Sequence, residues 1–389
     1  MKKAVILGID CWYPQVDGVT NAVKNYRKNL RGGGFDCEIV APSYGKKSDE
    51  EGEERYCGGV FHHFSLSVPF LSFRNSMPGC DKKLKKFLDE RQPALLHAHS
   101  PFAICGYFIK YAKKHNIPVV YTFHTKYRDE FFRVTHSRLI TAIMMSTIMR
   151  NIRRADYVWA VSGKAAETLR EYGYSGEIKV VPNGTDMRPA AEGEHASLAE
   201  QVRKQYGISP DERLFLYVGR VVNVKNLKFS FEVVAELNKR GFRCRFFVVG
   251  GGDELEEHKR LVSKLGMDDM VIFTGFVGDR EALRRYYACA DLFLLPSVFD
   301  NTPLVVLEAA SLGTPSVVPA GSSAAELIED GATGYCVELN VKRWANRIMA
   351  IFSDEGKAAA VSKNCSSIAC SWEKAVSDAE AEYRRIIDI

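Results

Sequence analysis

The chain has 389 residues, of which 46% are hydrophobic and 26% are charged, a composition typical of a globular protein of about two or three domains. No apolar run approaches the roughly 20 residues that a membrane span requires, and Asp10 interrupts the first short run, so we expect neither a transmembrane helix nor a signal peptide. Ten cysteines without a C-x-x-C pair favour free thiols in the cytoplasm over zinc or redox chemistry.

The charge is distributed unevenly along the chain. Residues 1–188 contain 29 Lys and Arg against 19 Asp and Glu, and the remainder contains 24 against 29, within an overall net charge of +5. The basic first half predicts a surface for an anionic partner, whether nucleic acid, anionic lipid or a phosphorylated metabolite. No aromatic residues interleave the basic runs as a stacking platform would, which argues against nucleic acid.

Short apolar runs alternate with helical stretches from one end of the chain to the other. They are apolar on both faces, which is typical of strands in parallel sheets that are covered by helices. Two tandem series of such runs predict an α/β fold with two doubly wound, Rossmann-like domains and a ligand cleft between them. The runs span residues 3–9, 36–43, 94–100, 118–124, 157–162, 178–184, 213–219, 244–250, 270–276, 291–297, 314–320 and 334–339.

The boundary between the two domains is expected in the polar stretch that follows Gly184. We assign residues 1–188 to an N-terminal Rossmann-like domain, residues 189–370 to a C-terminal Rossmann-like domain, and residues 371–389 to a helix that packs back toward the N-terminal domain. The segment "KKSDEEGEERY", residues 46–56, is typical of an exposed charged loop.

The segment "SVFDNTPLVVLEAASLGTPSVV", residues 297–318, predicts a loop, a helix and a strand after a preceding strand. Thr302 and Pro303 have the residue types of a helix N-cap and a first helical position, and Gly313 is a typical left-handed stop. A helix is therefore expected to begin at this point.

That segment contains two acids, Asp300 in the loop and Glu308 in the second helical turn. The loop edge of an α/β sheet is where ligands bind, and a helix N-terminus offers its amides to an anion. The acids would then hold ligand hydroxyls beside a bound phosphate. A solvated loop Asp and an ordinary surface Glu are the alternative.

Arg220 and Lys225 follow another predicted strand, on a loop that leads into a helix. A forked guanidinium and a compact ammonium suit the clamping of a diphosphate, and isolated surface cations are the alternative. The run Gly250–Gly252 lacks the third glycine of a dinucleotide fingerprint, so we expect a close-packed strand end there. The sequence contains no G-x-x-x-x-G-K-[ST], H-E-x-x-H or G-x-S-x-G motif.

An ordered set of segments, distributed over nearly the whole chain, resembles the retaining glycosyltransferases of family 4, which have the GT-B fold. The segments are "YPQVDGV", "HAHSPF", "PVVYTFHTKY", "AVS", "VPNGTD", "GRVVNVKN", "VVGGGDEL", "IFTGFV", "ADLFLLPS" and "DNTPLVVLEAASLGTPSVV". The last of these corresponds to the E-x7-E element of the family, with Asp300 in place of the first Glu. The shorter side chain is expected to alter the selectivity for the donor sugar. The segment "YTFHTKYRDEF" is also similar to bacterial glucosyl-diacylglycerol synthases of this family.

The resemblance implies catalytic and donor-binding roles for the matching residues. Glu308 would accept from the ribose hydroxyls, and Asp300 from a hydroxyl of the donor sugar. Arg220 and Lys225 would neutralise the departing diphosphate, with help from the amides around Leu304.

The resemblance also implies a second group of site residues. Phe276 and Val277 would present their backbone to the base, and Gly18 would allow close approach to the phosphates. His124 would line the acceptor side near the anomeric carbon. Donor binding would be completed by Asn301 and Thr302.

His97 and His99 alternate onto one face of a predicted strand, which raises the question of a metal site. No carboxylate or third ligand of suitable spacing accompanies them. We therefore expect no metal, and no cofactor besides the nucleotide sugar that serves as substrate.

The expected reaction transfers a hexose, with UDP-glucose as the first choice of donor, to an acceptor hydroxyl with retention of the anomeric configuration. No carboxylate nucleophile is evident, which favours a front-face path with the departing phosphate as base. A non-catalytic nucleotide-sugar-binding protein is the alternative that the change to Asp300 leaves open.

The acceptor is expected to bind to the basic half of the chain. Residues 81–91 place Leu84, Phe87 and Leu88 on one helical face among lysines, which suits an anionic membrane surface. Residues 137–154 form either a buried helix of the first domain or a second such segment. A membrane glycerolipid is the favoured acceptor of a cytoplasmic protein at the inner face of the plasma membrane, and a surface polysaccharide or a small hydroxylated metabolite is the alternative.

Overall fold

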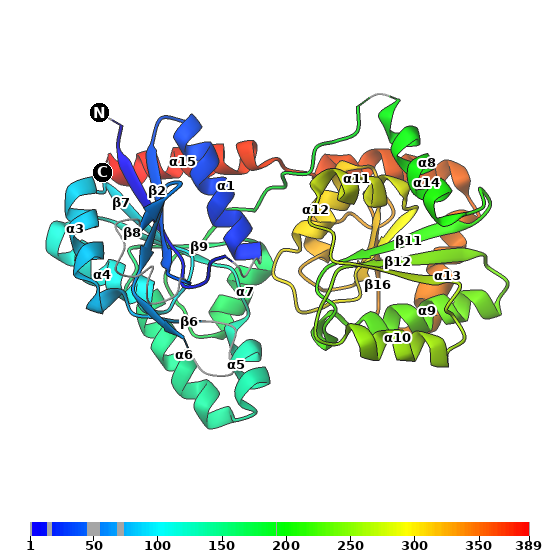
Figure 1. The fold of residues 1–389 in the computed structure, drawn as a ribbon, viewed down its shortest axis with the longest axis horizontal. Coiled ribbons are helices and arrows are strands. Elements are labelled where there is room, and N and C mark those ends of the chain that lie inside the picture. Colours follow the sequence, from blue (N-terminus) through cyan, green and yellow to red (C-terminus); the bar gives the residue numbers. More distant parts are fainter. Residues whose placement is uncertain (1, 14–17, 45–54, 68–73, 192, 389) are drawn as a thin grey trace. The chain divides into compact units, whose positions relative to one another are not determined.

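The computed structural model describes residues 2–13, 18–44, 55–67, 74–191 and 193–388. The chain divides into two compact units: unit 1 comprises Met1–Gly184 and Trp372–Ile389, and unit 2 comprises Thr185–Ser371. Each unit contains a parallel sheet covered by helices, which confirms the predicted α/β fold class with two Rossmann-like parts (Figure 1). Residues 46–54 of the predicted charged loop and residues 14–17 of "YPQVDGV" lie outside the described residues.

The main sheet of unit 1 has the strand order β10-β9-β8-β7-β1-β2-β4-β3 and is parallel except for the β3–β4 pair. The chain adds β2 on one side of β1 and later returns to add β7 on the other side, so the strand order reverses between β1 and β7. Ligands bind at such a reversal in open α/β sheets. The strands are β1 (Ala4–Gly8), β2 (Asp36–Pro42), β3 (Tyr56–Cys57), β4 (Val60–His63), β7 (Leu95–Ala98), β8 (Val119–Phe123), β9 (Tyr157–Ala160) and β10 (Lys179–Val180), and β5 (Ser65–Ser67) pairs separately with β6 (Arg74–Ser76).

The last helix of the chain belongs to unit 1, where it packs against the first described helix (Figure 1). Its Tyr383 ring stacks on Trp159 of β9 with a centroid distance of 5.3 Å. These aromatic contacts tie the carboxyl end of the chain to the sheet of unit 1. The helices are α1 (Gly18–Gly32), α3 (Lys82–Arg91), α4 (Ala103–His115), α5 (Tyr127–Thr135), α6 (Arg138–Ile152), α7 (Gly163–Glu171) and α15 (Trp372–Ile387).

Helix α3 does not offer its apolar face to a membrane. Leu84 and Leu88 are fully buried and Phe87 is 7% exposed, so the prediction that these three side chains face a lipid surface is wrong. Asp81 caps the helix by accepting from the amides of Lys83 and Leu84, and the face that follows packs into the core of the unit. The three apolar side chains therefore belong to the core of unit 1, and the lysines of this helix form its exposed face.

The sheet of unit 2 has the order β13-β12-β11-β14-β15-β16 and is parallel throughout. Its strand order reverses between β11 and β14, and all six strands predicted for this half are present. The strands are β11 (Arg213–Val218), β12 (Cys244–Val249), β13 (Val271–Gly275), β14 (Leu292–Leu294), β15 (Ser316–Pro319) and β16 (Tyr335–Val337). The helices are α8 (Glu194–Tyr206), α9 (Leu227–Lys239), α10 (Leu255–Lys264), α11 (Arg280–Cys289), α12 (Leu304–Ser311), α13 (Val341–Phe352) and α14 (Glu355–Cys365).

The start of α12 differs from the prediction. The helix begins at Leu304 with Pro303 at the N-cap position, and no side chain in the described part of the chain caps it. The Thr302 hydroxyl instead donates to the Asn301 carbonyl at 2.8 Å, so the predicted N-cap role of Thr302 is wrong. Pro303 itself is extended, with ψ of 105°, so the helix starts past it and its first amides have no side-chain acceptor among the described residues. Gly313 has φ of 73° just after the helix, as predicted.

Gly250 and Gly252 form the close-packed strand end that was predicted. A Cβ atom at Gly250 would lie 1.9 Å from the carbonyl oxygen of Gly219, and one at Gly252 would lie 2.3 Å from that of Val221. Any side chain at either position would therefore push apart the loops that follow β11 and β12. No described helix is long and apolar enough to span a bilayer.

Candidate active site

Two loops that are distant in sequence meet at the carboxyl ends of β11 and β14. These strands are parallel neighbours, so their following loops leave the same edge of the sheet. The Ser297 hydroxyl donates to the carbonyl of Val224 at 3.4 Å, and Lys225 Nζ forms a salt bridge with Asp300 Oδ1. Two of the residues predicted to act together are therefore in direct contact, at the point where the strand order of unit 2 reverses.

The Lys225–Asp300 pair is mostly buried, with side-chain exposures of 17% and 19%. The second carboxylate oxygen, Asp300 Oδ2, has no hydrogen-bond partner among the residues that the structure describes. Buried polar atoms are normally satisfied, so Oδ2 is suited to accept from a ligand hydroxyl. The ammonium of Lys225 has three N–H groups, and those not used by Asp300 suit an anion.

Arg220 belongs to the same cluster through Tyr217. The Tyr217 hydroxyl, at the end of β11, donates to the carbonyl of Arg220 at 2.9 Å. Burial raises the pKa of Tyr217, the Asp300 carboxylate raises it further and the Arg220 guanidinium lowers it, so both charged groups act on this one phenol. Tyr217 thus contacts the backbone of Arg220 and lies within electrostatic range of the Arg220 guanidinium and of Asp300, the partner of Lys225.

Glu308 is 9% exposed and is held by two donors from α11. The Tyr287 hydroxyl donates to Oε2 at 2.7 Å, and the Arg280 guanidinium donates to Oε1 at 3.0 Å and also pairs with Asp186. Burial raises the pKa of Tyr287 and the Glu308 carboxylate raises it further, which keeps the phenol a neutral donor. A carboxylate has about four acceptor positions, so Glu308 is oriented yet retains capacity for ligand hydroxyls.

Arg280 and Tyr287 are part of the site although the sequence did not predict them there. Their spacing of seven residues places them on one face of a helix, which is the signal that could have revealed them. The loop that carries Phe276 and Val277 leads from β13 directly into α11, and the Phe276 side chain is 84% exposed. This loop therefore joins the residues predicted to meet the base to the helix that orients Glu308.

The predicted residues of unit 1 lie at or near its own strand reversal. His99 follows β7 and its Nδ1 is 2.9 Å from Nε2 of His124, which follows β8. His97 Nε2 is 2.7 Å from the Thr122 hydroxyl, and its Nδ1 contacts the Tyr383 hydroxyl. His97 thus has a hydrogen-bond partner at both ring nitrogens, whereas the buried His99 Nε2 has none among the described residues. No group of three or more metal-ligating side chains occurs in the described part of the chain.

Burial governs the protonation of this histidine cluster. It lowers the pKa of His97 and His99 and lowers that of His124 to about 3, so all three rings are neutral near pH 7. A neutral His124 can exchange a hydrogen bond with a hydroxyl without carrying charge. Gly18 is the first residue of α1, and a Cβ atom there would meet open space within the described residues.

Asp10 is a further residue of this edge that the sequence analysis did not assign. Its carboxylate accepts from the amide of Ile104 at 3.2 Å, and its own amide donates to the Ser100 hydroxyl at 3.1 Å. Burial raises the pKa of Asp10 to about 7, although hydrogen bonds lower it in part. The group that follows β1 is therefore a carboxyl that titrates near neutral pH.

Two family profiles match the chain side by side. Residues 16–188 match the Glycosyltransferase Family 4 profile, and residues 199–367 match the profile described as Glycosyl transferases group 1. The crystal structure of Anabaena Alr3699/HepE in complex with UDP and glucose superposes with a TM-score of 0.77 at 18% identity, over 98% of this chain and 100% of that one. The fold and the two profiles define a glycosyltransferase of the GT-B class.

Relatives whose names state an activity are similar in sequence to this chain over most of their length. An alpha-monoglucosyldiacylglycerol synthase of Streptococcus pneumoniae is 26% identical over 84% of this chain and 73% of its own length. A GDP-mannose-dependent alpha-mannosyltransferase of Corynebacterium glutamicum is 27% identical over 87% of this chain and 77% of its own length. The chain belongs to glycosyltransferase family 4.

Proposed function

We propose that the protein transfers glucose from UDP-glucose to a hydroxyl of a membrane glycerolipid, with retention of the anomeric configuration and without a metal ion. The observation that carries this proposal is the cluster at the strand reversal of unit 2, where Lys225 meets Asp300 and where Glu308 is oriented by two donors. This arrangement offers cations for a diphosphate and carboxylates for sugar hydroxyls within one edge of one sheet.

The roles of the donor-site residues follow from their chemistry. Lys225 and Arg220 would stabilise the charge that builds on the diphosphate as the glycosidic bond breaks, which is the largest single contribution expected in such a site. The uncapped amides at Leu304 would add the attraction of a helix N-terminus. Asp300 Oδ2 would accept from a sugar hydroxyl and Glu308 from the ribose.

The proposal also assigns roles to residues around this cluster and in unit 1. The backbone of Phe276 and Val277 would meet the base, and Asn301 and Thr302 would complete the donor site. In unit 1, Gly18 would allow close approach to the phosphates. His124 would accept from or donate to the sugar near the anomeric carbon as a neutral ring, because burial keeps it uncharged.

Transfer with retention is proposed to follow a front-face path. The departing phosphate oxygen would take the proton of the acceptor hydroxyl as the new glycosidic bond forms on the face that the diphosphate leaves. This path requires strong stabilisation of the leaving group, which is the role given to Lys225 and Arg220. The test is the anomeric configuration of the product, read by NMR from the coupling constant of its anomeric proton.

The donor is best identified by thermal stabilisation with a panel of UDP-glucose, UDP-galactose, GDP-mannose and UDP. A ligand that binds only the folded state stabilises it by about 2.7 kcal/mol at one hundred times its Kd, whatever the acceptor. We expect the largest shift with UDP-glucose and a much smaller shift in Lys225→Ala. A larger shift with GDP-mannose would replace the proposed donor by that of the mannosyltransferase relative.

The acceptor is tested by adding diacylglycerol in vesicles to enzyme and UDP-glucose and measuring released UDP and glycolipid. Product in this assay supports a glycerolipid acceptor, which is the acceptor class in the name of the Streptococcus pneumoniae relative. Turnover only with a polysaccharide fragment or a small polyol would move the acceptor to those classes. Donor binding without released UDP under all conditions would indicate a non-catalytic nucleotide-sugar-binding protein.

A further inference from the structure

The side chain of His99 in unit 1 is fully buried and has one hydrogen-bond partner in the described part of the chain. Its Nδ1 lies 2.9 Å from Nε2 of His124, and the two residues follow the neighbouring strands β7 and β8. The ring centroids are 5.2 Å apart and the ring planes are inclined by 26°. Because the centroids are so much further apart than the two nitrogens, each nitrogen lies near the line between the ring centres, where an imidazole N–H bond or lone pair points. The contact is therefore a hydrogen bond close to the plane of both rings.

One hydrogen occupies this contact, and there are two ways of placing it. Burial lowers the pKa of both His99 and His124 below the ordinary value, so both rings are neutral near pH 7 and each carries a single N–H. Either His99 donates from Nδ1 and its Nε2 carries no hydrogen, or His124 donates from Nε2 and the hydrogen of His99 lies on Nε2. The surroundings of His99 Nε2 therefore decide between the two arrangements.

His99 Nε2 is buried without a hydrogen-bond partner among the described residues. The ring of His97 packs on His99 at a centroid distance of 4.0 Å, but its two nitrogens already contact Thr122 and Tyr383. Tyr26 makes a T-shaped ring contact with His99 at 5.4 Å. A hydrogen on Nε2 would be a buried donor without an acceptor, which costs about 1–3 kcal/mol, whereas a buried acceptor without a donor is better tolerated. The hydrogen of His99 is therefore assigned to Nδ1.

The second nitrogen of His124 is then a hydrogen-bond donor. His124 is partly buried, and its Nδ1 makes no hydrogen bond within the residues that the structure describes. Since Nε2 accepts from His99, a neutral His124 carries its hydrogen on Nδ1. This nitrogen can donate to an oxygen of a ligand, but it has no lone pair with which to take up a proton.

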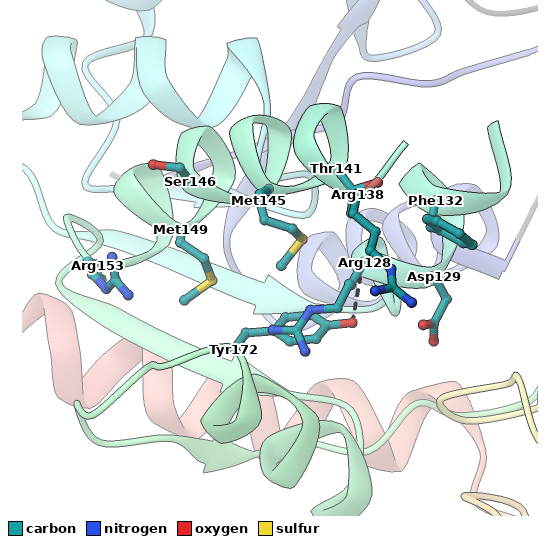
Figure 2. A pocket seen from close by; sticks show the side chains of 11 residues that line it. Arg128, Asp129, Phe132, Arg138, Thr141, Met145, Ser146, Met149, Arg153 and Tyr172 are labelled. Carbon is teal, nitrogen blue, oxygen red and sulfur yellow. Dashed lines mark hydrogen bonds between the residues drawn. The ribbon is translucent and has the colours of Figure 1, made fainter. Parts of the chain in front are cut away.

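The backbone on both sides of His124 is also fixed. Strand β8, which precedes it, pairs with β7 and with β9. Helix α5 begins at Tyr127, and the amide of Arg128 donates to the Tyr172 hydroxyl at 3.3 Å. Figure 2 shows this contact in the wall of a surface pocket, where the Arg128 guanidinium also covers the Tyr172 ring at 4.6 Å from its centroid. Because the backbone is held, the hydrogen bond from His99 sets what remains free in His124, the orientation of its ring and its tautomer.

We propose that His99 is a positioning residue that donates from Nδ1 to Nε2 of His124 and holds His124 as the Nδ1–H tautomer. In this form the other nitrogen of His124 donates a hydrogen bond to an oxygen of the donor sugar and does not act as a base. This role rests on the proposed function in one respect, since a sugar must bind beside His124. It agrees with the proposed front-face path, in which the departing phosphate takes the proton of the acceptor hydroxyl.

The tautomers can be read directly by NMR of the full-length protein with isotope-labelled histidine at neutral pH, because the two nitrogens of an imidazole resonate far apart when only one carries hydrogen. His99→Asn and His124→Asn assign the two rings by the loss of their signals. We expect Nδ1–H on both rings and a scalar coupling across the hydrogen bond between His99 Nδ1 and His124 Nε2. Nε2–H on either ring, signals averaged over both tautomers, or a positively charged ring would overturn the proposal.

Two variants of similar shape separate the hydrogen bond of His99 from the space that its ring fills. His99→Asn places an amide nitrogen where Nδ1 stood, whereas His99→Leu has a similar outline and cannot donate. We expect His99→Leu to lower kcat about ten- to one hundredfold, more than it raises the Kd of the donor, and His99→Asn to stay within about threefold of the parent. Equal losses of kcat in the two variants would show that His99 only fills space and would overturn its positioning role.

Tyr172→Phe is the matched control for the loop that carries His124. It removes the hydrogen bond to the Arg128 amide without touching either imidazole, so the His99 and His124 signals should remain those of the parent. A changed tautomer of His124 in Tyr172→Phe would mean that the loop, and not His99, sets the tautomer. The measurement on the parent needs no folded variant at position 99 beyond the assignment that His124→Asn also provides.

The outcome is distinguishable from failure of the proposed function. The tautomers are read without substrate, and thermal stabilisation by a nucleotide sugar does not depend on them. Nδ1–H on both rings without stabilisation by any nucleotide sugar would keep the hydrogen bond from His99 and remove the proposed donor. Transfer of glucose by a protein whose His124 carries Nε2–H would keep the function and reject the positioning by His99.

Discussion

The two units have the same kind of parallel sheet but place opposite chemistry at the point where the strand order reverses. Unit 2 places ion pairs there: Lys225 with Asp300, and Arg280 with Glu308. Unit 1 places neutral rings there, with His99 hydrogen-bonded to His124. One architecture therefore supports either stabilisation of a developing charge or handling of an uncharged hydroxyl, and the choice is made by the loop residues rather than by the fold.

Lowering the pH should have the largest effect, and it should act on unit 1. His97, His99 and His124 have pKa values in the folded state below the ordinary value of 6.5. Their contribution to stability is complete above about pH 6.5 and is lost as the pH falls, at about 1.4 kcal/mol per pH unit for each ring. Asp10 has a pKa raised to about 7, so its effect on stability is opposite: stability rises as the pH falls and offsets the loss from one histidine. Burial also lowers the pKa of His63, at the end of β4, to about 4, so this ring adds to the same loss. We therefore expect the free energy of unfolding of unit 1 to fall by about 4 kcal/mol per pH unit between about pH 6 and pH 5.

Tryptophan fluorescence can report this unfolding for unit 1 alone. Trp344 is the tryptophan of unit 2, so Trp344→Phe leaves Trp12, Trp159 and Trp372 as reporters of unit 1. In that background His124→Asn should reduce the slope by about 1.4 kcal/mol per pH unit, and the exposed His136→Asn should not. An unchanged slope in the His124 variant would show that its ring is not held neutral.

The sequence was sufficient for much of the fold because parallel strands buried on both faces leave a strong signal. All twelve predicted apolar runs contain strands, whereas the short β3 to β6 carry polar residues and were not predicted. The direction of an amphipathic face was less predictable: Leu84 and Leu88 of α3 face the core, and Leu139 of α6 does not. Periodicity shows that a helix has an apolar face but not which of its neighbours covers it.

The same limit applies to the candidate site. Lys225 and Asp300 could be predicted because each follows a strand and the resemblance supplies the pairing. Arg280 and Tyr287 could not be assigned in this way, because their role depends on α11 packing beside α12. Side chains that act by orienting another residue are visible only in three dimensions.

Because unit 2 places ion pairs at its strand reversal, removing one of these cations should lower turnover more than removing an exposed lysine of the same unit. Lys225→Ala should lower kcat by about one hundred- to one thousandfold, because the leaving diphosphate loses a fixed positive charge in a mostly buried site. Lys228→Ala, an exposed lysine in the next helix, is the matched control and should lower it less than twofold. Turnover is measured as UDP released with saturating donor, and an effect below twofold for Lys225→Ala would remove it from the mechanism.

Glu308→Gln tests whether the second acid grips the donor. The amide keeps the shape but removes the charge that Arg280 faces and an acceptor for the ribose, so the Kd of the donor should rise about ten- to one hundredfold. Tyr287→Phe keeps that charge and removes one orienting hydrogen bond, so its effect should be within about tenfold. Isothermal titration with the donor gives both values, and the reverse ranking would show that Glu308 acts through structure alone.

The smallest expected effect concerns the acid that departs from the pattern of the family. Asp300→Glu extends the side chain by one methylene. Oδ2 of Asp300 has no partner among the described residues, so it is the oxygen that could accept from a sugar hydroxyl. The substitution would move this oxygen. A buried acceptor positioned for one sugar hydroxyl discriminates between epimeric sugars, and a displaced acceptor discriminates less well. The ratio of kcat/KM between UDP-glucose and UDP-galactose should therefore shift by a few-fold, about 1 kcal/mol, with the salt bridge to Lys225 retained. Asp253→Glu, in the exposed turn after β12, provides the matched control. An identical ratio in parent and Asp300→Glu would mean that this carboxylate serves Lys225 and does not touch the sugar.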